Sequence, residues 1–161
     1  MSPEPEVSRI VDQLERVMCA DAWYGEPVVS LLQRIPFSKA NAKPARGAHS
    51  VREIVRHMTA WTNEVRRRLN GMPAATPKEG DWPKASGKGE AAWADEIDAL
   101  IGAHNALILE LKALTDGQLS APIRDPRNRK TREGVTRYVL LHGLAQHHAY
   151  HAGQIAILSK Q

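Results

Sequence analysis

Cysteine is almost absent from this sequence, and long apolar runs are absent altogether. The 161 residues contain one cysteine, Cys19, so no disulfide can form within the chain. A single free cysteine is typical of proteins in a reducing compartment, and we therefore expect a cytoplasmic location. No apolar run approaches the roughly 18 residues of a membrane-spanning helix, and residues 1–6 lack the basic and apolar regions of a secretory signal. We expect neither a membrane-spanning segment nor export.

Aromatic residues are also scarce, and the charge is only weakly biased. Aromatic side chains make up 5% of the chain, and 22 lysines and arginines against 18 acidic residues give a formal charge of +4. So small an excess, without aromatic residues interleaved among the basic ones, does not favour nucleic-acid binding. The 42% of hydrophobic residues is ordinary for a globular protein, so we expect a single domain over residues 1–161 with one sizeable core.

Apolar residues recur at steps of three and four rather than alternately, which predicts helices and no strands. The pattern covers four segments, with a break at residues 25–27 in the first: about 7–34, 50–71, 93–114 and 132–159. The second segment has both ends marked, because Ser50 and Glu53 have the spacing of a capping box and Asn70-Gly71 follows its last apolar residue. Four amphipathic helices of this length predict an all-α protein, a four-helix bundle.

Histidines occupy positions in these helices where a bundle core expects apolar side chains. In the last segment His147 and His151 lie one turn apart in an otherwise apolar row, and His57 lies in the corresponding inward row of the second segment. Two imidazoles at i and i+4 can hold one zinc, nickel or ferrous ion while a third ligand comes from a neighbouring helix. Hydrogen-bonded core imidazoles are the alternative, and the spacing alone leaves both interpretations open.

Four further residues near these rows are candidates for other roles. His148 is turned about 100° around the helix from its neighbour, which predicts either a general acid or base at the rim of the site or a surface histidine. Glu64, seven residues after His57, either assists catalysis, by orienting an imidazole or acting as a base, or is a solvated carboxylate. We expect His104 to be a satisfied core imidazole and Cys19 to be a small core residue.

Basic residues gather in the segment 124–132, which directly precedes the last helix. The simplest interpretation is a solvated loop. A second interpretation is that Arg127 and Arg129 bind the carboxylates of an anionic substrate or of a thiol co-substrate, because the loop lies near one end of the expected core. Arg66-Arg67-Arg68 in the second helix is expected to be a solvated face.

The last helix resembles that of the DinB-like superfamily, which includes the YfiT-like metalloenzymes, over the stretch Gln146-His147-His148-Ala149-Tyr150-His151-Ala152-Gly153-Gln154-Ile155. The helix at residues 50–71, with its inward His57 and its Leu-x-Gly end, and the break at residues 22–27 are similar to the same superfamily in the same order. The resemblance implies an up-down-down-up four-helix bundle, in many members a homodimer, with metal ligands at His57, His147 and His151.

Characterised relatives in this superfamily are transferases or isomerases that use a low-molecular-weight thiol such as bacillithiol or mycothiol. The resemblance therefore implies a divalent metal ion, zinc or nickel, and a thiol S-transferase that acts on a small molecule. Three neutral imidazoles leave a coordination position open, which is typical of a catalytic site. Two alternatives stay open: a metal-dependent hydrolase, and a non-catalytic, stress-linked bundle module that kept the metal for stability or lost it.

Overall fold

The computed structural model describes residues 5–44, 47–129 and 135–160. Within these ranges the chain is helical and contains no β-strand. Four helices are long: α1 (Glu6–Met18), α4 (Val51–Leu69), α5 (Gly89–Lys112) and α7 (Arg137–Leu158). Short helical turns lie in the connections: α2 (Val28–Leu32), α3 (Phe37–Ala40), α6 (Asp116–Leu119) and the 3-10 turn η1 (Pro126–Arg129).

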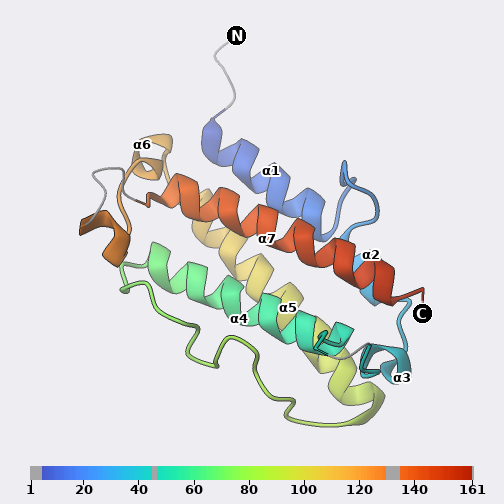
Figure 1. Ribbon diagram of the computed structural model, residues 1–161. Helices are drawn as coiled ribbons and strands as arrows, with labels where there is room; N and C mark the ends of the chain where they lie inside the picture. The colour runs from blue at the N-terminus through green and yellow to red at the C-terminus, as the bar shows by residue number, and fades with distance from the viewer. Residues whose placement is uncertain (1–4, 45–46, 130–134, 161) are drawn as a thin grey trace.

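The four long helices form a bundle (Figure 1). α4 packs against α5 and α7, and α1 packs against α7 and α5, which closes the ring of neighbours. α1 and α7 run in one direction, and α4 and α5 run in the opposite one, so the order along the chain is up, down, down, up. The all-α fold predicted from the sequence is confirmed. No helix in the described part of the chain is long and apolar enough to cross a membrane.

Two apolar clusters fill the bundle, and a polar layer lies between them. α4 enters one cluster with residues 51–58 and the other with residues 65–69, and α5 and α7 are divided in the same way. On each of these three helices a fully buried polar residue lies between the two stretches: Thr62, His104 and His148. The core is therefore apolar toward both ends of the bundle and polar at its middle.

The first predicted helix is shorter than expected, because the regular helix ends at Met18 and not near residue 34. Tyr24 Oη donates to the carbonyl of Val17 at 2.9 Å, which satisfies one of the acceptors left free at the helix end. The chain then turns through Gly25, whose φ of +132° favours glycine, and becomes helical again after Pro27. The predicted break at residues 25–27 is present, but it is only the last part of a non-helical segment that begins after Met18.

Two other helix ends differ from the sequence prediction. α7 begins at Arg137, after Thr136 accepts from the backbone N–H of Val139 at 3.3 Å, and the expected start, Arg132, lies outside the described residues. The third segment, expected at about 93–114, is helical from Gly89 to Lys112, and Asp116 then begins the short helix α6. The carboxylate of Asp116 also accepts from the first backbone N–H groups of α1, at 2.8 and 2.9 Å, and so ties the start of α1 to the start of α6.

The connection of residues 72–88, which we call the strap, runs beside α4 (Figure 1). Arginines of α4 hold it by donating to its backbone carbonyls at 2.7 to 2.8 Å: Arg68 to Ala75, Arg56 to Pro83 and Arg52 to Gly87. A long segment without regular structure is thereby fixed along one helix, next to the histidines described below.

The capping box predicted at the start of α4 is present. Ser50 Oγ accepts from the backbone N–H of Glu53 at 3.2 Å, and Glu53 Oε2 accepts from the backbone N–H of Ser50 at 2.8 Å. α4 therefore begins where the sequence indicates, and this start sets the position of every later residue on the helix.

We expect Ser50→Ala to lower the free energy of unfolding by about 1 kcal/mol, because the substitution removes a buried cap and leaves the Glu53 amide without its partner. Chemical denaturation measures the change. Ser8→Ala, at an exposed position of α1, is the matched control and should change the stability by less than about 0.5 kcal/mol. Equal losses from the two substitutions would contradict the capping role.

Candidate metal centre

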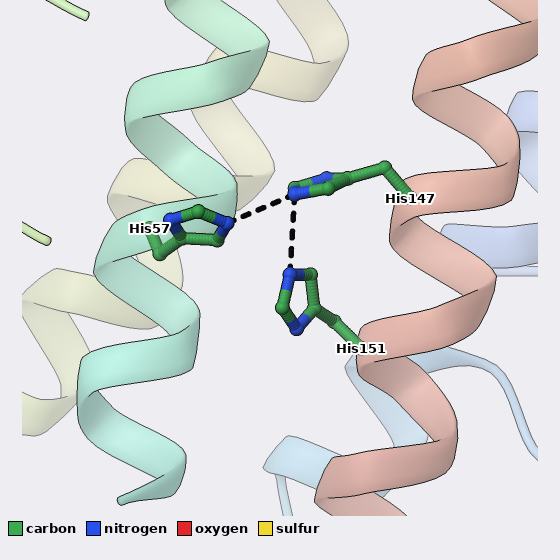
Figure 2. Close-up of side chains that lie close together, drawn as sticks. All are labelled: His57, His147 and His151. Carbon is green, nitrogen blue, oxygen red and sulfur yellow. Dashed lines mark hydrogen bonds between the residues drawn. The ribbon is translucent and has the colours of Figure 1, made fainter. Parts of the chain in front are cut away.

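Three imidazoles meet between α4 and α7 (Figure 2). His57 comes from α4, and His147 and His151 come from successive turns of α7. Nε2 of His147 lies 2.9 Å from Nε2 of His57 and 3.1 Å from Nε2 of His151. The structure thus brings together the three histidines that the sequence places in inward rows, and it groups them closely enough to hold one metal ion.

The outer nitrogens of two of these rings are already occupied. His57 Nδ1 donates to the carbonyl of Asp81 at 2.6 Å, and His151 Nδ1 donates to Gln154 Oε1 at 2.7 Å. A neutral imidazole with its proton on Nδ1 carries a lone pair on Nε2, so both rings aim lone pairs at His147. A single proton on His147 Nε2 can form a hydrogen bond with only one of these two lone pairs. A cation satisfies all three nitrogens, so this donor set fits a metal ion.

The spacing and the charge state of the rings agree with this fit. Two nitrogens bound to one tetrahedral zinc ion at about 2.0–2.1 Å lie about 3.3–3.4 Å apart, so small ring rotations reach that geometry. Burial, followed by the nearby His151 and His57, lowers the pKa of His147 to about 4. Burial also lowers the pKa of His151. Both rings are therefore neutral near pH 7, which is the form that binds metals.

The strap covers the His57 side of the centre. Trp82 stacks on the His57 ring with the centroids 4.0 Å apart, and Trp61 Nε1 donates to Asp81 Oδ1 at 2.7 Å. These contacts fix the His57 ring and its tautomer, as outer partners of metal-binding histidines commonly do. Asp81 and Trp82 were not predicted from the sequence, because they lie in a polar, irregular segment where a tryptophan is the only signal.

A cavity of about 580 Å³ adjoins the three histidines, which form part of its wall. The rest of the wall is mostly apolar, and two arginines, Arg68 and Arg127, also line it. Arg68 lies over the ring of Trp61, 5.5 Å from its centroid, and its Nε donates to Glu64 at 2.9 Å. Its side chain is only 10% exposed, so the expected solvated face is wrong at this residue.

The basic loop before α7 contributes to this cavity through one of its two expected arginines. Arg127 donates to the Asp125 carboxylate from Nε and Nη2, at 2.9 and 2.7 Å. This bond is the main cause that lowers the pKa of Asp125 to about 2. The side chain of Arg129 lies outside the described part of the structure.

His148 and Glu64 lie in the interior and not at the surface. His148 is fully buried, and its Nε2 donates to Thr62 Oγ1 at 3.1 Å; burial holds its pKa well below the usual range. Glu64 is 1% exposed and accepts from Arg67 and Arg68. The expectations of a rim or surface histidine and of a solvated carboxylate are wrong, because neighbouring helices cover α7 on more than one face and the strap closes over Glu64.

Cys19 and His104 complete the set of residues considered from the sequence. Cys19 is exposed, so its expected core position is wrong. The regular helix α1 ends at Met18, and Cys19, the C-cap residue, no longer lies on the buried face of the helix. His104 is fully buried as expected, and burial lowers its pKa, but its Nδ1 has no hydrogen-bond partner in the described part of the chain, so the expectation of a satisfied imidazole is wrong. Its Nε2 lies 3.5 Å from Glu15 Oε2.

The fold and the three converging imidazoles define a helical bundle with a candidate metal centre in its middle. The sequence model of the DinB superfamily matches residues 26–155, and the chain belongs to this superfamily. A solved structure described as the conserved protein of a locus from Enterococcus faecalis is similar with a TM-score of 0.62 and 16% identity, over 98% of this chain and 97% of that one. That similarity shows a shared fold. No curated protein matches the chain.

We expect His57→Ala, His147→Ala and His151→Ala each to lower the number of nickel ions bound per chain by one, because two remaining imidazoles hold an ion far less well than three. Equilibrium dialysis with metal analysis measures this number. His142→Ala, on α7 but outside the group, is the control and should leave it unchanged. A triple variant that binds as many ions as the unaltered protein would show that the ligands are assigned wrongly.

The metal-free protein should lose stability as the pH falls from about 6.5 to about 4. In the folded chain the pKa of His147 is about 4, whereas in the unfolded chain it is about 6.5. Between these two pH values only the unfolded chain takes up the proton. The free energy of unfolding therefore decreases as the pH falls through this range, and it keeps its full value above about pH 6.5. Denaturation in a chelator at several pH values measures it, and His147→Gln should give a shallower dependence. A flat profile for the unaltered protein would contradict the shift.

Proposed function

We propose that the protein binds a divalent transition metal ion through His57, His147 and His151 and uses it in a reaction on a small molecule. The observation that carries the proposal is the meeting of three Nε2 atoms in the wall of a cavity of about 580 Å³. A structural metal site is normally closed by a fourth protein ligand, whereas three neutral ligands beside a cavity leave room for a substrate. Three imidazole ligands beside a cavity therefore favour a catalytic site over a structural one.

Zinc or nickel suits three imidazoles, and the metal available in the cell decides between them. When bound, such an ion supplies a double positive charge that favours the ionised form of a thiol or of water in the cavity. No nucleophilic side chain is then required of the protein.

The reaction that we propose joins a low-molecular-weight thiol, through its sulfur, to an electrophilic small molecule. The thiol proton passes to solvent, the sulfur forms a bond to the electrophilic carbon, and the leaving group of the electrophile departs with the electrons of the broken bond. The apolar walls, with Trp61 and Trp82 among them, exclude water and hold the electrophile. Arg68 and Arg127 lie in the same wall and bind carboxylates of the thiol. Asp81 keeps the His57 ring in the tautomer that presents Nε2.

His148 and Glu64 have supporting roles in this proposal. Neither lines the cavity, so neither reaches a bound substrate directly. His148 joins α7 to α4 through its hydrogen bond to Thr62, and Glu64 holds Arg68 in place. His148 thus keeps the two helices that carry the imidazoles in a fixed relation, and Glu64 keeps an arginine of the cavity wall in place.

A metal-dependent hydrolase and a non-catalytic, stress-linked module are the alternatives. The hydrolase requires only that water take the place of the thiol in the cavity. The homodimer, the cytoplasmic location, the extent of the single domain over residues 1–161 and the absence of nucleic-acid partners stay predictions from the sequence.

We expect the metal-loaded protein to accelerate the reaction of at least one carboxylate-bearing cellular thiol with a generic electrophile, and the chelated protein not to. Arg127→Gln should raise the KM for that thiol several-fold and change kcat less, since the arginine contributes binding and not chemistry. Arg124→Gln, which replaces an exposed arginine outside the cavity wall, is the control.

The same assay separates the alternatives. No rate above the metal-free protein with any thiol, together with metal-dependent cleavage of ester or amide substrates, would replace the transferase with the hydrolase. No metal-dependent rate with either substrate class would overturn the proposal that the protein is an enzyme.

A further inference from the structure

A second group of metal-ligating side chains lies between α1 and α5. Glu15 and Cys19 are one turn apart at the end of α1, and His104 faces them from the middle of α5. A carboxylate oxygen, the thiol sulfur and an imidazole nitrogen of these residues all lie within 4.8 Å of one another. The group shares no residue with the three-histidine centre.

The contact between His104 and Glu15 has the geometry of a poor hydrogen bond but the spacing of two metal ligands. His104 Nε2 lies 3.5 Å from Glu15 Oε2, which is at the outer limit for an N–H···O bond. A nitrogen and an oxygen bound to one tetrahedral zinc ion, each at about 2.0–2.1 Å, lie about 3.3–3.4 Å apart. The two atoms are therefore placed as neighbouring ligands more nearly than as donor and acceptor.

The environment of the group favours a cation. His104 is fully buried, and its other ring nitrogen, Nδ1, has no hydrogen-bond partner within the described part of the chain. The contact with Glu15 is therefore the only polar contact described for the imidazole of His104. The last carbonyl groups of α1 carry partial negative charge at the same place. Cys19 is exposed, so an ion can enter from solvent and keep a water molecule as a further ligand.

We propose that Glu15, Cys19 and His104 bind a zinc ion that links the end of α1 to α5. The set of one nitrogen, one sulfur and one oxygen ligand suits zinc, which accepts all three. Binding displaces the thiol proton of Cys19, which passes to solvent, and the thiolate becomes the ligand. The zinc ion fastens α1 at the point where the chain leaves the bundle for the irregular segment before α2.

Cobalt(II) substitution tests this site in the unaltered protein. Cys19 is the one cysteine of the 161 residues, so any thiolate-to-cobalt charge-transfer absorption arises from this group and not from the three histidines. We expect this absorption to saturate at one cobalt ion per chain at the second site. It should disappear in Cys19→Ser. Glu15→Gln should weaken binding more than about tenfold, since loss of even an outer partner of a ligand costs 10–100-fold.

Two controls keep the outcome specific. Asp12→Asn changes a neighbouring exposed carboxylate of α1 and should leave the absorption unchanged, and so should His57→Ala, which removes only a ligand of the other centre. No thiolate absorption in excess cobalt, or the same absorption in Cys19→Ser, would overturn the proposal.

Alkylation of Cys19 gives a second measurement that needs no substitution of the buried His104. Zinc should slow the reaction of iodoacetamide with the unaltered protein and with His57→Ala, and should slow it much less with Glu15→Gln. Equal alkylation rates with and without zinc in the unaltered protein would contradict the site, whatever the three-histidine centre binds.

Discussion

Buried imidazoles need partners, and this requirement organises the middle of the bundle. An uncompensated polar group in an apolar core costs free energy, so each ring must find a hydrogen bond or an ion. His148 finds Thr62, and His57 and His151 find Asp81 and Gln154 with their outer nitrogens. The Nε2 atoms of His57, His147 and His151 face one another, and only a cation can interact favourably with all three. The candidate metal centre thus lies beside the polar layer that divides the apolar core, since His147 and His151 flank His148 on α7.

α4 connects this layer to the rest of the chain. It carries His57 and also the arginines that hold the strap. Two of these arginines, Arg52 and Arg56, also donate to the buried Glu96 of α5, at 2.7 and 3.2 Å. A buried carboxylate is tolerated only when it is paired, so these bonds set the separation of α4 and α5. The strap in turn contacts the candidate metal centre, because the carbonyl of Asp81 accepts a hydrogen bond from His57.

Membership of the DinB superfamily and the chemistry of the site answer different questions. The superfamily match and the similar solved structure concern the arrangement of helices, and one fold supports many activities. In the proposed function, the substrate is selected by side chains that line the cavity, among them Trp61, Trp82 and Arg127. Two of these lie outside the four long helices, in connections that the helical arrangement does not constrain.

Local chemistry in the sequence determined the helices and the rows that they bury. The all-α class, the capping box at Ser50 and the inward rows of His57, His147 and His151 follow from residue spacing, because an α-helix repeats every 3.6 residues whatever surrounds it. The inward rows of histidines suggested that the three rings meet. Only the packing of α4 on α7 brings the Nε2 atom of His147 to about 3 Å from those of His57 and His151.

Only the tertiary structure decided the environment of the other residues. His148 and Glu64 are buried because neighbouring helices and the strap cover faces that periodicity alone assigns to solvent. Cys19 is exposed because Tyr24 and Gly25 end the first helix earlier than its apolar pattern does. Asp81 and Trp82 reach His57 through contacts across more than 20 residues of sequence. Burial and long-range contacts depend on how elements pack together, and the spacing of residues within one element carries no record of that packing.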